Sequence, residues 1–315
     1  MWDGLDSRIL REMLLDPVAL TFQADVRGAY RKIGQRLGVT EDTVRNRVKA
    51  FEKGYLRGWR VGINPTILGY RTSSIDFDSR PVAKSESLRV MRTVPGMMLL
   101  KNYYGDYVGG LVAYRDEESL KEKLSLILRG TSNPGTVERV DVRFPNCDVK
   151  LLETDWEIVK ALQRDPRRRY DEVAEQLRVS PRTVRRRLER MVEGRALFVV
   201  PDQNLRALRG VTKVDFRIGY TDPRVKHEVD RVLISSFDAY FSMPFFSDSD
   251  HASFCIFLPN IPMAEEMLAR VRKIPGVREA SMRILLDVVN LLEEFLRREV
   301  EDGRRAVEIE ELRAA

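Results

Sequence analysis

The residues of this sequence whose types and spacing suit chemistry are basic and polar side chains, gathered in two stretches. An arginine can donate two hydrogen bonds to the edge of a guanine, and an asparagine can pair with an adenine in the same bidentate way. Arginines farther from the bases contact phosphates and fix the register on the duplex. We therefore interpret these residues as candidate contacts to double-stranded DNA: Thr40, Thr43, Arg45, Asn46, Arg47 and Lys49, and then Arg168, Arg169, Ser180, Arg182, Thr183, Arg185, Arg186 and Arg187.

Both stretches have the pattern of an amphipathic helix that presents these side chains on one face. Apolar residues recur at helical spacing on the opposite face. Thr40 and Ser180 are good N-caps, and Pro181 stands at the first helical position, where its missing N–H costs least. Gly54 and Gly194 follow the two helices, as expected where a helix stops. The apolar positions are Val44, Val48 and Phe51 in the first helix, and Val184, Leu188 and Met191 in the second.

The two stretches belong to a long internal repeat. Residues 30–68 align with residues 170–208 without a gap. A repeat of this length constrains the architecture before any site is considered. In each copy a short amphipathic helix and a turn precede the polar helix, and an extended segment follows it, which predicts a winged helix-turn-helix with a two-strand wing. In such a motif the second helix lies in the major groove, with its N-terminal half at the base edges.

A further helix is expected before each of these units, at residues 5–15 and 154–162, because apolar residues recur there at helical spacing. The first copy has an insertion of about nine residues after this helix, around residues 17–27, which we expect to form a longer loop or a short extra turn.

After each helical unit the pattern changes to alternating strands and helices in the order β-α-β-β-α-β, which is that of a ferredoxin-like domain. We therefore predict an α+β fold in which two winged helix-turn-helix domains alternate with two ferredoxin-like domains. The last expected helix covers residues 287–300. The predicted domains are residues 1–64, 65–150, 151–204 and 205–290, followed by a C-terminal helix and tail at 291–315.

Composition excludes several classes of protein. The chain has 315 residues, 43% of them hydrophobic and 32% charged, with a net charge of +6. A modest basic balance fits a polyanionic partner without proving one. We find no apolar run long enough to cross a bilayer, and the N-terminus lacks the order of a signal peptide. We therefore expect a cytoplasmic, nucleoid-associated protein that does not contact a membrane.

Residues typical of metal sites and of catalysis are scarce. Cys147 and Cys255 are the only cysteines, and neither has a CxxC partner, which argues against a disulfide framework and a cysteine zinc site. The sequence contains no catalytic triad pattern, no phosphate-binding Walker loop and no HExxH motif. We therefore expect a protein that is not an enzyme and has no catalytic residue, metal or cofactor.

The stretch VTEDTVRNRVKAFEKGYLRGWRVGINPTILGY resembles the helix-turn-helix and linker of the leucine-responsive/asparagine-synthase regulator (Lrp/AsnC) family. The resemblance covers nearly the whole chain as two family units in tandem. It is strong at residues 40–70 and weaker at 180–194, and the second wing and linker, FVVPDQNLRALRG, depart from the family pattern. It implies a DNA-binding transcription regulator whose ferredoxin-like domains bind an effector and oligomerise.

In that family a glycine-aspartate step between the middle strands of the effector domain helps to form the small-molecule site. The residues that match it, and that we assign to an amino-acid-like effector, are Tyr104, Gly105, Asp106 and Tyr107. A plain hairpin turn explains this step equally well. The second copy has Ser247-Asp248-Ser249-Asp250-His251 there, without the glycine. The resemblance also implies that the ferredoxin-like domains pair, either within one chain or between two chains in a homodimer.

Two alternatives remain. Siroheme decarboxylases share the two-domain plan, but such an enzyme needs histidines and arginines around a tetrapyrrole, and the only histidines of the sequence are His227 and His251. The other alternative is a nonspecific, chromatin-like DNA binder, whose affinity would depend almost entirely on phosphate contacts and would fall steeply with salt.

Overall fold

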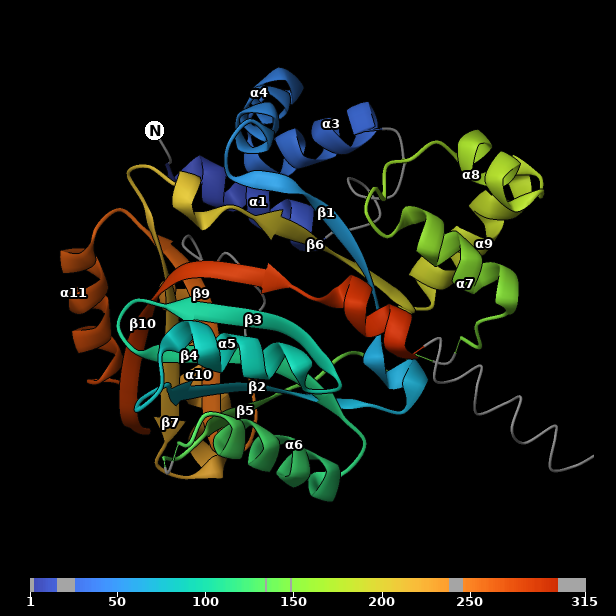
Figure 1. Cartoon of the computed structure of the whole chain (residues 1–315). Helices are drawn as coiled ribbons and strands as arrows, with labels where there is room; N and C mark the ends of the chain where they lie inside the picture. Colours follow the sequence, from blue (N-terminus) through green and yellow to red (C-terminus); the bar gives the residue numbers. More distant parts are fainter. Residues whose placement is uncertain (1–2, 16–25, 134, 148, 238–245, 300–315) are drawn as a thin grey trace, which may run out of the picture.

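The computed structural model describes residues 3–15, 26–133, 135–147, 149–237 and 246–299. Two helical units lie on one side of a body formed by one large sheet and its covering helices (Figure 1). The insertion after the first helix and the C-terminal tail fall largely or wholly outside the described residues. The same is true of most of residues 239–246, where the β-α-β-β-α-β pattern of the second copy predicts its second strand.

The three helices expected in each copy are confirmed. The first unit contains α1 (Gly4–Leu15), α3 (Val26–Leu37) and α4 (Glu41–Glu52), and the second contains α7 (Glu153–Leu162), α8 (Tyr170–Leu177) and α9 (Pro181–Glu193). Thr40 and Ser180 cap α4 and α9, since each hydroxyl accepts a hydrogen bond 3.1 Å long from the N–H three residues later. The apolar faces of both units join one continuous hydrophobic core, which also contains the strands between them.

The strand that follows each helical unit pairs with its counterpart in the other copy. β1 (Leu56–Ile63) and β6 (Leu197–Gln203) form an antiparallel two-stranded sheet, with Trp59 opposite Pro201 and Ile63 opposite Leu197. The expectation that each copy forms a two-strand wing of its own is therefore wrong for the described residues. Each extended segment contributes a single strand, and its hydrogen bonds go to the other copy.

The body is an eight-stranded sheet in the order β5-β2-β4-β3-β10-β7-β9-β8. The element order β-α-β-β-α-β, expected from the sequence, is observed in both halves. The first half consists of β2 (Arg71–Asp78), α5 (Lys84–Thr93), β3 (Met97–Tyr103), β4 (Tyr107–Tyr114), α6 (Glu117–Gly130) and β5 (Glu138–Val142). The second consists of β7 (Thr212–Tyr220), α10 (Lys226–Phe237), β8 (Phe246–Ser247), β9 (His251–Leu258), α11 (Ile261–Val271) and β10 (Val277–Asn290).

β10 joins the two halves because it is longer than expected. Its first part pairs with β7, and after a register shift between Leu285 and Asp287 its last part pairs with β3. The predicted helix at 287–300 is therefore wrong over residues 287–290, which are strand, and correct over residues 292–299. A short apolar run is ambiguous between helix and strand, and here the open edge of β3 decides in favour of the strand.

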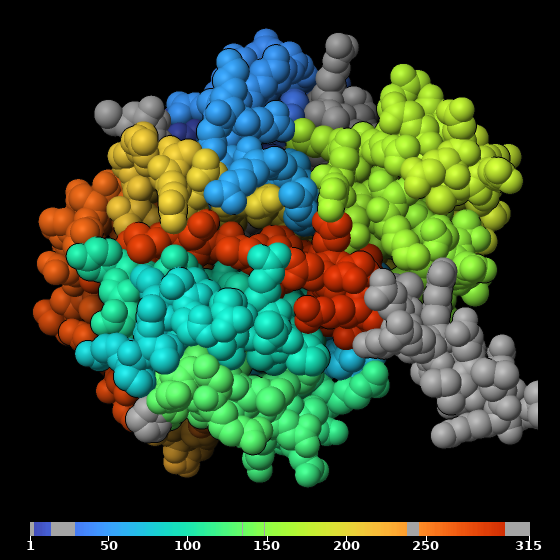
Figure 2. All heavy atoms as spheres, in the orientation of Figure 1, coloured from blue at the N-terminus to red at the C-terminus, as the bar shows by residue number. Residues whose placement is uncertain are grey.

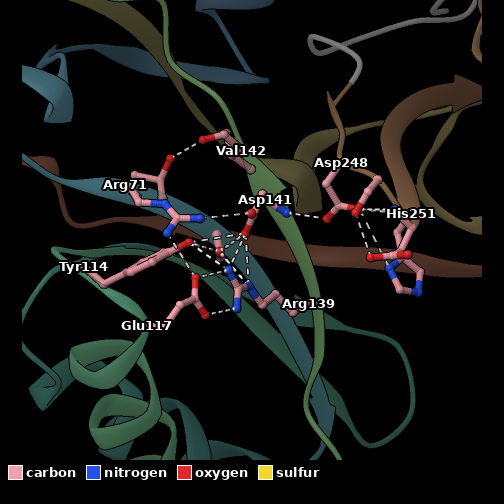
Figure 3. Close-up of polar contacts among 12 residues, drawn as sticks. Arg71, Tyr114, Glu117, Arg139, Asp141, Val142, Asp248 and His251 are labelled. Atoms are coloured by element: carbon pink, nitrogen blue, oxygen red, sulfur yellow. Dashed lines mark hydrogen bonds and ion pairs between the residues drawn. The ribbon is translucent and has the colours of Figure 1, made fainter. Parts of the chain in front are cut away.

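The two outer edges of the sheet also approach each other. β5 and β8 lie at opposite ends of the strand order, yet they are in contact. The backbone N–H of Asp141 on β5 donates a 2.8 Å hydrogen bond to the carboxylate of Asp248, in the turn between β8 and β9 (Figure 3). The sheet therefore curls back on itself, and a side chain rather than a ladder of backbone bonds spans the seam.

Candidate nucleic-acid interface

α9 presents an arginine-rich face to solvent. Arg182 and Arg186 are exposed, and the structure gives neither a hydrogen bond nor an ion pair with any described residue. Arg185 donates a 2.8 Å hydrogen bond to Glu189, which raises the pKa of its guanidinium. Thr183 bonds the Ser180 hydroxyl at the start of the helix. Two guanidinium groups near the N-terminus of α9 are thus available to an external anion.

α4 occupies in the first unit the place that α9 occupies in the second, but the two helices differ in net charge. Asn46 and Lys49 are exposed, and no described residue is recorded as their partner. Arg45 forms ion pairs with Glu41 and Asp42, in the first turn of its own helix. α4 carries as many acidic as basic residues, whereas α9 has no acid in its first turn and an excess of arginine. Phosphates are therefore attracted to α9 more strongly than to α4.

The candidate contacts Arg47 and Arg187 are held within their own units. Arg47 pairs with Asp6 on α1 at 3.0 Å, and Arg187 pairs with Asp155 on α7 at 3.1 Å. Both carboxylates are buried, and burial raises the pKa of Asp6 more than Arg47 lowers it. The same contact in both copies orients the polar helix on the first helix of its unit. Sequence reasoning missed it, although the two aspartates occupy equivalent places.

The buried carboxylate of Asp155 both caps α7 and pairs with arginines of α9, so its removal gives a testable prediction about stability. It accepts a 2.8 Å hydrogen bond from the N–H of Leu152 at the start of α7, and it also pairs with Arg187 and Arg190. We expect Asp155→Ala to lower the free energy of unfolding by about 2–3 kcal/mol, because a helix cap and a buried charged partner are lost together.

Urea unfolding measures this loss. Asp171→Ala is the matched control, since Asp171 is an exposed carboxylate of the same unit paired with exposed Arg169. Equal losses in the two variants would show that the buried network does not hold the unit together.

The arginines before α8 are bound to neighbouring side chains. Arg168 bonds Gln176 and lies 3.6 Å from Glu172, and Arg169 bonds Asp171. Arg169 remains exposed at the surface, so a phosphate would compete with an acidic neighbour for its guanidinium.

The two helical units have a fixed spacing. Besides the β1–β6 pairing, the buried side chain of Asn64 donates hydrogen bonds to the carbonyl oxygens of Pro145 and Arg195, at 2.7 and 2.9 Å. Both units lie on the same side of the molecule, above the sheet body (Figure 2). Nothing in the sequence indicated that Asn64 would link the two copies.

The candidate effector residues form the turn between β3 and β4. Gly105 has φ 74°, in the left-handed region that favours glycine, and its carbonyl accepts a 2.7 Å bond from Lys84. The side chain of Tyr104 is 72% exposed, and the Asp106 carbonyl accepts a bond from the Ser79 N–H. Tyr107 alone of the four is placed in the lining of a large pocket, beneath the guanidinium of Arg283.

Metal and membrane features are absent from the part of the chain that the structure describes. No group of three or more His, Cys, Asp or Glu side chains there could hold a metal ion. No helix there is long and apolar enough to cross a bilayer. His227 is exposed on α10, and His251 begins β9, with its ring 4.0 Å from Asp248.

Comparison with known proteins identifies relatives of two kinds. Residues 153–192 match the AsnC-type helix-turn-helix domain. The chain is 33% identical over 128 residues to the HTH-type transcriptional regulator Ptr1 of Methanocaldococcus jannaschii, covering 40% of this chain and 80% of that protein. It is 34% identical over 104 residues to the HTH-type transcriptional regulator LrpA of Pyrococcus horikoshii, covering 32% and 74%.

Among solved structures, the siroheme decarboxylase NirDL matches with a TM-score of 0.53 at 16% identity, over 95% of this chain and 99% of that one. At this identity the match shows a shared fold and nothing more. The regulators match at higher identity and over most of their own length, and an AsnC-type domain contains α8 and α9. The chain therefore belongs to the Lrp/AsnC family.

Proposed function

We propose that this protein is a sequence-specific DNA-binding transcription regulator that reads major grooves with two non-identical recognition helices, α4 and α9. The observation that carries the proposal is that Arg182 and Arg186, at the N-terminal half of α9, are exposed and have no recorded partner among the described residues. Both lie within the segment that matches the AsnC-type domain. The N-terminal half of a recognition helix is the part that reaches base edges. The related regulators support the same role.

The proposed regulator consists of two family units in one chain. Its domains are the helix-turn-helix units at 1–64 and 151–204 and the ferredoxin-like domains at 65–150 and 205–290. The pairing of β3 with β10 supports a unit in which the two ferredoxin-like domains associate within one chain. A single chain would then present two unlike helices to an asymmetric site, and a homodimer would present four such units.

The two helices have separate parts in this proposal. Arg182, Thr183, Arg185 and Arg186 on α9 supply most of the attraction to DNA, while Thr43 and Asn46 on α4 supply base discrimination with little net charge. Arg47 and Arg187 position their helices through Asp6 and Asp155.

A selection experiment tests this function directly. Genomic fragments are captured with the purified full chain at two salt concentrations and sequenced. We expect a small set of fragments to survive the higher salt and to share a motif without twofold symmetry. Diffuse binding that vanishes with salt would contradict sequence specificity and favour a chromatin-like role.

A second candidate function rests on the full-length match to a siroheme decarboxylase. If the chain captures no DNA, the enzymatic alternative is tested by adding siroheme to the purified protein. A shifted Soret band on binding would favour a tetrapyrrole enzyme, and an unchanged spectrum would exclude it.

A further inference from the structure

The turn between α7 and α8 in the second helical unit makes direct contact with the first unit. Arg167 in this turn donates a 2.7 Å hydrogen bond to the carboxylate of Glu52. Glu52 is the last residue of α4. The helix that is proposed to read DNA in the first unit is therefore fastened, at its C-terminal end, to the second unit.

Arg167 also lies against two further elements of the first unit. Its guanidinium carbon is 5.8 Å from the centre of the Trp59 ring on β1, within the range of a cation–π contact. Burial raises the pKa of Tyr30 on α3, and the neighbouring Arg167 opposes that rise. Trp59 and Tyr30 are both buried. One guanidinium group of the second unit thus contacts α3, α4 and β1 together.

The backbone of the same turn is bonded to β1. The carbonyl oxygen of Gln163 accepts a 3.1 Å hydrogen bond from the N–H of Val61. The side chain of Arg60 donates a 3.4 Å bond to the carbonyl oxygen of Arg164. Because these bonds restrict the position of the turn, the Arg167 side chain reaches α4 from a defined place.

The sequence provides for this contact on one side of the repeat only. In the alignment of residues 30–68 with residues 170–208, Val192 corresponds to Glu52, and Val199 corresponds to Trp59. A valine can form neither an ion pair nor a cation–π contact with a guanidinium group. The second copy therefore lacks the two side chains that hold Arg167, and the contact is not a by-product of the repeat.

The backbone pairing between the two units is narrow. β1 and β6 form a ribbon of two strands, and such ribbons twist more strongly than broad sheets do. Since α4 packs on β1 and α9 packs on β6, a change in the twist of the ribbon would turn the two helices relative to each other. The bond between Arg167 and Glu52 is made on α4 rather than on the ribbon, so it resists such a turn.

We propose that Arg167 is a positioning residue that fixes the separation and orientation of α4 relative to α9, so that the protein selects target sites with one spacing between their two halves. Each base pair added to B-DNA moves a half-site by about 3.4 Å and rotates it by about 35°. Two helices held rigidly meet this requirement at one spacing, whereas two loosely held helices meet it at several. The inference rests on the proposed function, because it assigns the spacing preference of the same two helices.

The first arm of the test needs no DNA and measures the distance between spin labels on α4 and α9 in the full chain. The labels are attached at Ala50→Cys and Glu193→Cys, two exposed positions, in a chain whose native Cys147 and Cys255 are replaced by alanine. Double electron–electron resonance gives the distribution of distances. We expect a narrow distribution when Arg167 is present and a broader one in Arg167→Ala. An equally narrow distribution in the variant would overturn the proposal.

The second arm uses the chain with its native cysteines and the DNA motif obtained by genomic capture. Fragments are made with one or two base pairs added or removed between the two halves of the motif. We expect the wild type to bind these fragments about tenfold more weakly or worse, a loss like that of one mismatched base pair. Arg167→Ala should bind the original fragment almost as tightly as the wild type and lose most of this discrimination. An unchanged ratio of affinities would contradict the positioning role.

Matched variants separate this role from a general loss of charge or stability. Arg164→Ala removes an arginine of the same turn whose side chain pairs with Glu293, and it should keep the narrow distribution and the spacing preference. Glu52→Gln should reproduce the effects of Arg167→Ala, and combining the two should add little, because both break one contact. Arg167→Lys keeps the charge beside Glu52 and should restore much of the preference. Fully additive effects would show that Arg167 acts through another contact.

The two arms also distinguish failure of this inference from failure of the proposed function. If the wild type captures no DNA, the function and the spacing preference both fail, while the label distances still decide whether Arg167 holds α4 and α9 in place. If the wild type binds one sequence equally well at every spacing, the function stands and the positioning role of Arg167 is refuted.

Discussion

Replacing both Arg182 and Arg186 with alanine is expected to weaken binding to the preferred DNA site by at least about 30-fold. Each arginine at a base edge or phosphate contributes about 1–3 kcal/mol, and within the described part of the chain neither Arg182 nor Arg186 has a partner whose contact would need to be broken first. The loss should also make affinity less dependent on salt, because fewer counterions are released. Fluorescence anisotropy with a labelled fragment, measured over a series of salt concentrations, gives both quantities.

The control for this prediction removes the same charge elsewhere. Arg270 and Arg278 are exposed, and α11, which carries Arg270, lies at the opposite side of the molecule from α9 (Figure 1). Arg270→Ala/Arg278→Ala should bind the fragment almost as tightly as the wild type. If the two double variants lose equal affinity, net charge rather than α9 determines binding, and the specific contacts proposed here are refuted.

Asp76→Ala is expected to lower the free energy of unfolding by about 3–5 kcal/mol. Removing one partner of a buried ion pair leaves the other charges uncompensated, and here Arg217, Lys101 and Arg283 would all lose their shared carboxylate. Denaturant unfolding monitored by circular dichroism measures the change. Asp78→Ala, two residues along the same strand, should cost much less, because the partner of Asp78 among the described residues is exposed Arg80.

The same carboxylate makes stability depend on pH in a defined direction. Because the net pKa of Asp76 is lower in the folded chain than its ordinary value, its contribution is fully present at neutral pH. It is lost as the pH falls through the folded pKa, below the ordinary aspartate range. The acid limb of the stability profile should therefore be flatter in Asp76→Ala than in the wild type, and an identical limb would assign acid sensitivity to other groups.

The elements that the sequence predicted best are those with local signals. The helices expected at residues 5–15 and 154–162 are observed within one residue of those bounds as α1 and α7, and Thr40 and Ser180 cap their helices as expected. Caps and periodicity depend on residues within one or two turns, so one sequence contains the information.

Elements decided by distant pairing were predicted less well. β10 extends through residues 287–290 only because β3 offers an open edge, and β1 pairs with a strand some 140 residues away. Neither partner can be identified from the local pattern. Gly194 follows the last residue of α9, as expected, but its φ is −78°, and the left-handed conformation falls on Arg195. A Cβ at Gly194 would lie 2.0 Å from Val149, so close packing requires the glycine.

In the candidate DNA-binding site, too, features set by local sequence could be predicted and features set by distant packing could not. The exposed arginines of α9 follow from amphipathic spacing, so Arg182 and Arg186 could be predicted to face solvent. The ion pairs of Arg47 and Arg187 could not, because they depend on how the first helix of each unit packs. The buried ion pair between Asp76 on β2 and Arg217 on β7 was missed as well, since it joins two strands whose relative placement the sequence left open.

The pairing of β1 with β6 has a consequence for inheritance. When two identical subunits form a symmetric regulator, a single change of codon alters both of its recognition helices at once. Here the strands that hold the two helical units together belong to one polypeptide, and α4 and α9 are encoded separately. If both helices read DNA as proposed, a mutation alters one of them while the other keeps its contacts, so the two halves of the target sequence can diverge one step at a time without complete loss of binding.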